Sequence, residues 1–349
     1  MTIKNNLLLI KIAYNMKKST LIILLSLIIL PGYAQKIHSS IEILKIMSAS
    51  KIGYQIATLS KPITATDYSE KLNYHDSYRL QTDSSILTKQ YRLSEKSSAI
   101  LQKAEMYFQA KDIDNALITY KSVLESDSTL YFVMTYIGQI YEDKGDHTNA
   151  IIWYKKAINK NYIDYMAHWF LADNYKAIND LKGAVEEITV ARILNRNNRR
   201  IKKSFDNIFL KAKRDTTDWY FNPQVEITKV DDKTVNVLMD AKWVGYGMCK
   251  ALWKCEPGYS ESMGVEKGKY STLEDRECLV SELIALTNAK IKIDDDKQLL
   301  VLRNTVDAKS FEEYILYEIV LPKQPAVAYQ LPQSTIESIK NYILNVRNK

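Results

Sequence analysis

The feature that most constrains the fold of this chain is a pattern that occurs three times, at a regular interval, in the segment 97–200. Each copy contains an alanine with an aspartate four positions before it and a tyrosine nine positions before it. These residues are Ala116, Ala150 and Ala184, Asp112, Asp146 and Asp180, and Tyr107, Tyr141 and Tyr175. Self-similarity at a fixed period of this length is typical of solenoids, in which every copy is one supersecondary unit stacked on its neighbours. The pattern therefore predicts a repeat protein.

The middle copy identifies the type of repeat by its small and aromatic residues. They are Gly138, Tyr141, Gly145, Asp146, Ala150, Tyr154 and Ala157, and the third copy has Ala191 at the position of Ala157. This arrangement resembles the tetratricopeptide repeat (TPR), a helix-turn-helix unit with a small residue where its two helices cross. The resemblance implies a mainly α-helical solenoid whose repeats cover 97–130, 131–164 and 165–198.

A capping helix is predicted directly after the third repeat. A solenoid needs such an element because its last helix cannot bury its inner face alone. Residues 199–214 carry an apolar stripe at helical spacing, formed by Ile201, Phe205, Ile208 and Ala212. The rest of this segment is mostly polar, as expected for the outer surface of a cap.

The segment 1–34 has the layout of a secretory signal peptide. A basic segment that begins at Met16 is followed by an apolar run over 21–30 and by small residues that end at Ala34. The apolar run is about ten residues long and falls short of the roughly 20 that span a bilayer. We expect a start at Met16, cleavage after Ala34, and an exported, periplasmic protein. The alternative is an uncleaved anchor that also uses residues 7–12.

The regions on both sides of the repeats combine helices and strands. Residues 35–96 predict a short helix near 41–47 and two strands, 78–81 and 86–92. Residues 225–239 predict a hairpin, and five of the ten glycines fall between 245 and 268 and predict bends.

The last third of the chain predicts a small α+β domain over 215–349. Ser271 or Thr272 caps a helix, and 310–321 is apolar and of ambiguous type, with a strand as one alternative. Ser334 and Glu337 predict a capping box at the start of the last helix. Residues 243–264 are similar to the tails of other exported bacterial TPR proteins.

The positive charge of the chain does not indicate a nucleic-acid partner. The net charge is +7, but four lysines precede residue 35 with no acid among them, so the remaining residues carry about +3. An excess of this size is ordinary for a soluble domain.

Histidines, cysteines and glycine motifs give no indication of catalysis. No histidine falls within 215–349 to activate a nucleophile there; the four are His38, His75, His147 and His168. Their scatter does not suggest a metal site, and no complete phosphate-binding loop occurs. We predict no enzyme, no metal and no cofactor. One disulfide or simple packing remain alternatives for Cys249, Cys255 and Cys278.

The resemblance also implies which residues meet a ligand, because in TPR arrays the first helix of each pair lines a concave groove. This ligand-facing row consists of Leu101, Glu105, Phe108, Thr135, Gln139, Glu142, Asp143, Trp169, Asp173 and Lys176. The family holds a C-terminal carboxylate with lysine and asparagine, where this chain has Glu105, Gln139 and Asp173.

Acids outnumber bases by four to one in this row, so it should repel a carboxylate. We predict a protein or peptide ligand of basic or neutral-polar character, with Phe108 and Trp169 as apolar anchors. The alternative is that the acids form a solvated helix face.

Nine basic residues and one acid lie between 192 and 214. Besides Arg192 and Arg196, these are Arg199, Arg200, Lys202, Lys203, Lys211, Lys213 and Arg214. The cluster predicts either weak contact with an anionic membrane surface or the soluble outer face that every solenoid cap requires.

These observations together favour an exported, non-catalytic adaptor or scaffold that binds proteins in the cell envelope. The alternative is a ligand-binding or enzymatic C-terminal domain that the repeats bring to its target.

Overall fold

The computed structural model describes residues 37–68, 77–81, 86–90 and 93–349, and the predicted signal peptide lies outside them. The chain forms two compact units, each built from two separate stretches. The first unit contains the described residues up to Thr66 together with Tyr220–Asp307. The second contains the described part of Asp67–Trp219 together with Ala308–Lys349. This division differs from the predicted linear one, in which 35–96 and 215–349 were separate regions.

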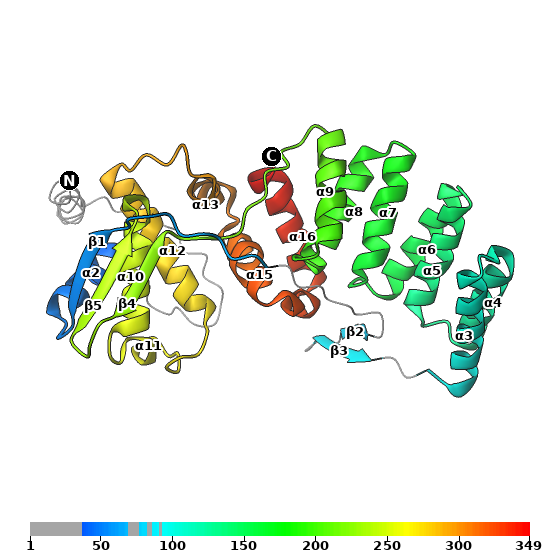
Figure 1. The fold of residues 1–349 in the computed structure, drawn as a ribbon, viewed down its shortest axis with the longest axis horizontal. Helices are drawn as coiled ribbons and strands as arrows, with labels where there is room; N and C mark the ends of the chain where they lie inside the picture. Colours follow the sequence, from blue (N-terminus) through cyan, green and yellow to red (C-terminus); the bar gives the residue numbers. More distant parts are fainter. Residues whose placement is uncertain (1–36, 69–76, 82–85, 91–92) are drawn as a thin grey trace. The chain divides into compact units, whose positions relative to one another are not determined.

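Three helix pairs form the centre of the second unit. They are α3 (Glu95–Gln109) with α4 (Ile113–Ser126), α5 (Tyr131–Asp143) with α6 (His147–Lys160), and α7 (Tyr165–Ala177) with α8 (Leu181–Leu194). Figure 1 shows them stacked in chain order. The predicted mainly α-helical array of stacked pairs is confirmed.

A further helix, α9 (Arg199–Lys211), continues the array. Its first residue follows Tyr165, the start of α7, by the same interval that separates Tyr165 from Tyr131, the start of α5. It packs on α8 and α7 and buries Ile201, Phe205 and Ile208. The predicted capping helix therefore exists, and its register is that of the first helix of another repeat.

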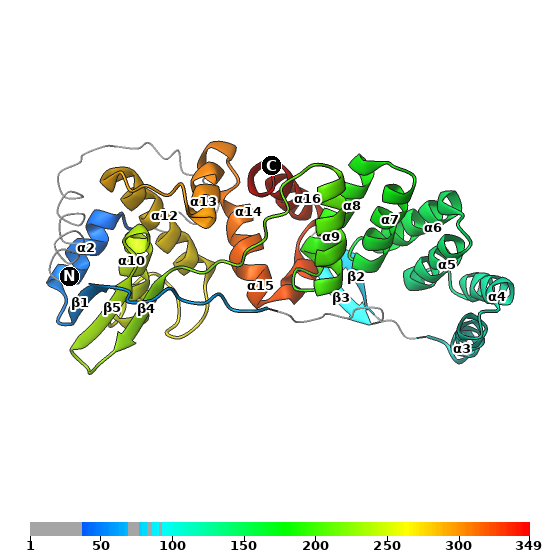
Figure 2. The same cartoon turned by 45° about the horizontal axis from the view of Figure 1, so that its top comes forward.

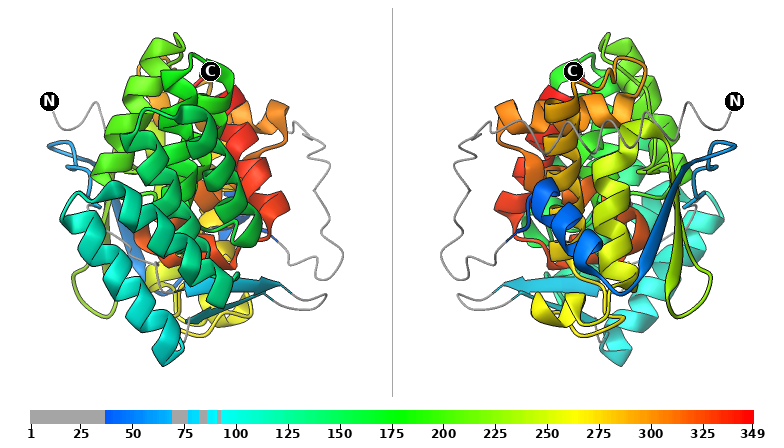
Figure 3. Two further views of the ribbon diagram at one scale, coloured as in Figure 1. Left: turned by 90° about the vertical axis from the view of Figure 1, so that its right-hand side faces the viewer. Right: turned by 90° about the vertical axis from the view of Figure 1, so that its left-hand side faces the viewer.

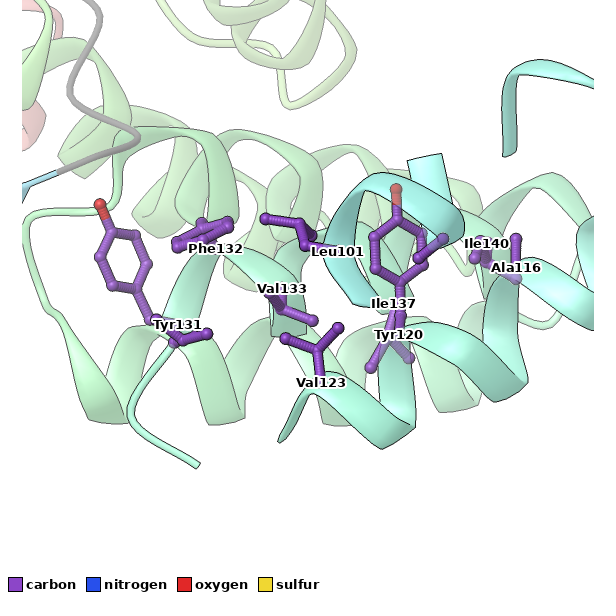
Figure 4. Packing of buried hydrophobic residues seen from close by; sticks show 11 residues of the cluster. Leu101, Ala116, Tyr120, Val123, Tyr131, Phe132, Val133, Ile137 and Ile140 are labelled. Atoms are coloured by element: carbon purple, nitrogen blue, oxygen red, sulfur yellow. The ribbon is translucent and has the colours of Figure 1, made fainter. Parts of the chain in front are cut away.

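The core of the array depends on small residues where helices cross. Figure 4 shows the packing around Ala116, Tyr120 and Ile137 in the first two pairs. A Cβ atom on Gly138 would lie 2.5 Å from the ring of Tyr154, which is itself fully buried. Any larger residue at position 138 would therefore displace that ring.

The turn inside each repeat has the same local structure. The repeat aspartates accept a hydrogen bond from the backbone N–H three residues later and so cap the second helix; they are Asp112, Asp146 and Asp180. The residue before each aspartate is left-handed, with φ of 60° at Lys111, 73° at Gly145 and 63° at Asn179. Glycine and asparagine adopt this conformation readily, whereas lysine is strained in it.

Replacing Lys111 by glycine should therefore stabilise the first repeat. We expect the free energy of unfolding to rise by about 0.5 to 1 kcal/mol, because relief of the strain exceeds the entropy that glycine adds to the unfolded chain. Gly145→Ala is the matched control, since its new methyl group meets nothing within 4 Å and only backbone strain is added. In urea denaturation followed by circular dichroism, the midpoint should rise for Lys111→Gly and fall for Gly145→Ala.

Short helical segments complete the second unit. They are α14 (Phe311–Tyr314), η2 (Ile315–Val320), α15 (Leu321–Lys323), η3 (Pro325–Gln330), α16 (Gln333–Tyr342) and η4 (Ile343–Arg347). A strand at 310–321 is therefore wrong: this run is helical, with apolar side chains buried on more than one face. Helix α16 packs on α8 of the last repeat.

The predicted capping box of α16 is also wrong. The helix begins at Gln333 after Pro332, with no side-chain cap, so Ser334 already lies within its first turn. Glu337 instead accepts a hydrogen bond from the Tyr162 hydroxyl at 2.7 Å and pairs with Lys340. The carboxylate thus links α16 to the loop before α7 rather than to its own backbone.

A buried ionic cluster holds the end of the chain against the last repeat. Arg347 donates from Nε to Glu318 at 2.7 Å and from Nη2 to Asp218 at 2.8 Å. Arg192 donates to the second oxygen of Asp218 at 2.8 Å. Burial by itself would raise the pKa of Asp218, but Arg196, Arg347 and Arg192 outweigh it and hold that pKa below its usual range.

A two-stranded hairpin also belongs to the second unit. Strands β2 (Ser77–Gln81) and β3 (Ile86–Gln90) pair antiparallel, with Ser77 opposite Gln90. The two predicted strands are confirmed, apart from positions 91–92, which lie outside the described residues.

The first unit is a three-stranded sheet with helices on one face, as Figures 2 and 3 show. Strand β1 (Gly53–Thr58) runs parallel to β5 (Thr234–Met239), and β5 pairs antiparallel with β4 (Val225–Lys229). The predicted hairpin is confirmed, but its partner β1 comes from the N-terminal stretch.

Helices of the first unit pack on this sheet and on each other. Besides α2 (Ser40–Ala49) they are η1 (Ala241–Trp243), α10 (Val244–Cys255), α11 (Tyr259–Ser262), α12 (Thr272–Ala289) and α13 (Lys297–Ala308). Helix α10 contacts β4, β5, α2 and α12. Ser271 caps α12, as predicted, by accepting from the backbone N–H of Leu273. None of the described helices is long and apolar enough to cross a membrane.

The glycines of this unit have two different roles. Gly258, Gly264 and Gly268 have positive φ and form the predicted bends. Gly245 and Gly247 instead lie inside α10, where a bend was also predicted. They are needed there for close packing, since a Cβ atom on Gly245 would lie 2.4 Å from the carbonyl oxygen of Ser281 on α12.

Candidate functional site

A groove of about 710 Å³ lies between α7 and α9 in the second unit. Its walls are Trp169, Asp173 and Lys176 of α7, Arg200, Lys203, Ser204, Asp206, Asn207 and Leu210 of α9, and Thr216. Residues three and four apart share one face of a helix, so each helix turns a single face to the groove. All three residues that the sequence placed in the ligand-facing row of the third repeat line this groove.

The α9 residues extend the ligand-facing row beyond the third repeat. One repeat period after Trp169, Asp173 and Lys176 stand Lys203, Asn207 and Leu210, which all line the groove. The predicted row ends at Lys176 because the sequence predicts residues 199–214 only as a cap. The same period, carried one step further, would have found these positions.

The acids of the groove already have partners. Asp173 accepts from Lys176 Nζ and from the Ser204 hydroxyl, both at 2.9 Å. Asp206 accepts from Lys202 Nζ at 2.5 Å. Their negative charge is therefore partly neutralised inside the groove.

Two cations of the groove have no such partner. Arg200 and Lys203 are exposed, and neither forms an ion pair with any other described residue. They lie one turn apart on α9, so their positive charges add on the same face. Leu210, which is 71% exposed, provides an apolar surface beside them.

The earlier part of the row differs from the prediction at two positions. Leu101 is buried in the core, and the buried Thr135 donates to Asp164 at 2.7 Å. Neither side chain is available to a ligand, because both are buried. Phe108 and Gln139 are half-buried.

The remaining acids of the row have no cationic partner among the described residues. Glu142 accepts from the Tyr154 hydroxyl at 2.7 Å and from the Asn174 side chain at 2.9 Å, which are both neutral donors. Glu105 is half-buried and Asp143 exposed, and neither forms an ion pair with a described residue. The α3 and α5 end of the row is therefore acidic.

The predicted basic cluster does not form one surface. Arg192 and Arg196 are buried, and Arg199 pairs with Asp67 at 2.6 Å. Arg200 and Lys203 face the groove, while Lys202 pairs with Asp206, and Lys211 donates to the carbonyl oxygen of Lys176. Lys213 and Arg214 line a second cavity of about 480 Å³ with Leu181, Val185 and Leu344, and Arg214 donates to the Leu344 carbonyl.

The first unit contains a buried carboxylate that meets a histidine. Glu277 of α12 accepts from the backbone N–H of His38 at 2.8 Å, from the Tyr259 hydroxyl at 3.0 Å and from Trp253 Nε1 at 2.6 Å. His38 Nδ1 also lies 3.0 Å from this carboxylate. No histidine occurs in the sequence after residue 215, but the N-terminal stretch folds onto these residues and brings His38 to Glu277.

The cysteines near this carboxylate do not have the properties of nucleophiles. Cys249 lies 3.8 Å from Glu277, but it is fully buried and burial raises the pKa of its thiol. None of the three cysteines, Cys249, Cys255 and Cys278, forms a disulfide. In the described part of the chain, no three His, Cys, Asp or Glu side chains are grouped so that they could hold a metal ion.

Comparison with known proteins supports the interpretation of the helix pairs. Residues 135–159, in the middle pair, match the family described as Tetratricopeptide repeat. This match identifies one tetratricopeptide repeat, in the middle pair. A search of curated proteins found no match to the chain.

Several solved structures are similar to the chain at low identity. The first TPR of Spaghetti (RPAP3), bound to an HSP90 peptide, is 18% identical, covers 34% of this chain and 98% of its own length, and has a TM-score of 0.34. The TPR2B domain of yeast Sti1, in a complex with pHsp70, is also 18% identical and covers 34% of this chain and 99% of its own, with a TM-score of 0.32. MamA is 16% identical and covers 57% of this chain and 97% of its own, with a TM-score of 0.31.

Proposed function

We propose that this protein binds a protein or peptide partner along the ligand-facing row of its repeats and acts as a non-catalytic adaptor. The groove between α7 and α9 carries the proposal, because both helices present the same repeat positions to it. A row of equivalent positions on successive helices suits an elongated segment, which contacts one helix after another.

The partner segment that meets α3 and α5 is basic or neutral-polar. In support, Glu105, Glu142 and Asp143 lie at this end of the row without a cationic partner among the described residues. Phe108 and Trp169 are half-buried and offer apolar anchors on α3 and α7. Aromatic anchors surrounded by complementary charge are typical of binding surfaces.

We further propose that the adaptor works in the cell envelope after export. The basic segment from Met16, the apolar run over 21–30 and the small residues up to Ala34 support export.

Charge reversal at the acidic end should reduce partner capture. We expect Glu105→Lys/Asp143→Lys to recover about tenfold less partner than the unchanged protein in a quantitative crosslinking pull-down from an envelope extract. Reversing two complementary charges costs a binding free energy of this order. Neither residue has a described ion-pair partner, so the fold should persist.

The matched control reverses two exposed acids away from the row, Glu125→Lys/Asp307→Lys. It makes the same change in net charge and should recover the partner at the unchanged level. Equal recovery by both double variants would contradict the proposed site.

A further inference from the structure

We infer that the groove between α7 and α9 binds carboxylate groups of the partner, so that the bound segment is charge-polarised and lies with its acidic end at α9. This inference rests on the proposed function and deepens it by giving the charge and the direction of the segment.

The charge balance of the groove is the first reason. The two acids that line it are paired, Asp173 with Lys176 and Ser204, and Asp206 with Lys202. Arg200 and Lys203 are the lining cations that have no pair among the described residues. The groove therefore offers two positive charges for an incoming anion, although counting residues along the sequence made the row acidic.

The geometry of the cations is the second reason. Arg200 and Lys203 lie on the same face of α9, and Asn207 continues that face one turn later with an amide that can donate hydrogen bonds. A guanidinium binds a carboxylate through two parallel hydrogen bonds, and a lysine beside it adds a third donor.

The shape of the groove favours a peptide over a small ion. Its volume of about 710 Å³ falls within the range typical of ligand pockets. Trp169 and the exposed Leu210 add apolar surface next to the cations. The Trp169 ring stacks on that of Phe170, with 5.3 Å between the ring centroids. A peptide segment with a carboxylate and a neighbouring apolar side chain can contact both the cations and the apolar surface of the groove.

The charge of the row changes sign from one end to the other. Two acids, Glu105 on α3 and Asp143 on α5, and two cations of α9, Arg200 and Lys203, have no ion-pair partner among the described residues. A segment with basic residues at one end and acidic residues at the other matches the row in one direction only, because the reverse direction places like charges together. These cations also lie outside the row of Glu105, Gln139 and Asp173, where the resemblance would place a carboxylate clamp.

Selection from a peptide library tests this inference with the full chain. The probe is a display library of random 12-residue peptides, presented once with a free C-terminal carboxylate and once with both ends blocked by constant residues. We expect aspartate or glutamate to be enriched at one end and lysine or arginine at the other. If acidic peptides are enriched in both formats, the groove binds side-chain carboxylates. If peptides are enriched only when the C-terminus is free, the groove binds the terminal carboxylate.

Charge variants locate the acidic end. Binding of the most enriched peptide, measured by fluorescence anisotropy, should weaken at least about tenfold in Arg200→Glu/Lys203→Glu, which corresponds to about 1.4 kcal/mol. Arg200→Gln/Lys203→Gln removes the charges without reversing them and should weaken binding less. The control Lys160→Glu changes one exposed lysine at the end of α6 and should leave binding unchanged. An unaltered melting curve shows that the variants are folded.

The remaining outcomes overturn the inference in distinguishable ways. Enriched peptides without acidic residues, or unchanged binding by Arg200→Glu/Lys203→Glu, would contradict the carboxylate site. Both results are compatible with the proposed adaptor function. No enrichment of any peptide removes the proposed function and the inference together. Co-sedimentation with anionic vesicles that depends on Arg200 and Lys203, without peptide enrichment, assigns these cations to a membrane surface instead.

Discussion

Replacing Arg347 by methionine is expected to lower the free energy of unfolding of the repeat-containing unit by about 3 to 5 kcal/mol. The guanidinium is 1% exposed and serves Glu318 and Asp218 at the same time. It also donates to the backbone carbonyl groups of Thr217 and Trp219. Without it, Glu318 keeps a buried charge whose nearest remaining cation is Arg196 at 3.8 Å.

Two further variants separate the buried charge from a general packing defect. In Arg347→Met/Glu318→Gln the uncompensated charge is removed while the Tyr342 hydroxyl keeps an acceptor, so part of the lost stability should return. Lys340→Met breaks the ion pair with Glu337 on the same helical segment, but that pair is partly exposed and should cost less than about 1 kcal/mol. A loss below this value for Arg347→Met in urea denaturation would show that the cluster does not hold the segment in place.

Gly245→Ala should destabilise the first unit by about 3 kcal/mol. The new methyl group would lie 2.4 Å from the Ser281 carbonyl oxygen and 2.7 Å from its carbon, which are backbone atoms of α12 and cannot turn away. The same carbonyl oxygen accepts from the Ser40 hydroxyl of α2 at 2.9 Å. The substitution therefore forces apart the point at which α2, α10 and α12 meet.

Gly247→Ala is the control two positions later on the same helix. Its methyl group would lie 2.9 Å from the sulfur of Met239, at the flexible end of a side chain that can move. We expect a change below about 1 kcal/mol, because the better helix propensity of alanine offsets the contact. Similar unfolding curves for the two variants would refute close packing at Gly245.

Much of the repeat array could be predicted from the sequence because its information is local. The regular period, the aspartate caps and the small residues at helix crossings can all be read within one helix pair and its neighbour. The same holds for the hairpin over 225–239 and for the cap at Ser271. The wrong predictions at 310–321 and at Ser334 are also local. A continuous apolar run does not distinguish a strand from a buried helix. At Ser334 the helix begins earlier than the capping box requires, at Gln333.

The candidate site could be predicted only in part. The resemblance implied that Trp169, Asp173 and Lys176 share one row, and all three line the groove. It could not give the charge of the groove, because that depends on which acids are paired. Asp173 is bound by Ser204 of α9, and Asp206 by Lys202 one turn away. Such pairings depend on side-chain geometry rather than on residue counts.

The sequence by itself determined the array of helix pairs and its register, because both repeat within a short window. Only the tertiary structure decided which distant residues the N-terminal and C-terminal stretches contact. Strand β1 joins β5 from a distant part of the chain, His38 reaches Glu277, and Arg347 closes the cluster at Asp218. These contacts join residues far apart in sequence through buried charge and sheet pairing, and no local pattern records which distant partner a strand or a charged side chain will find.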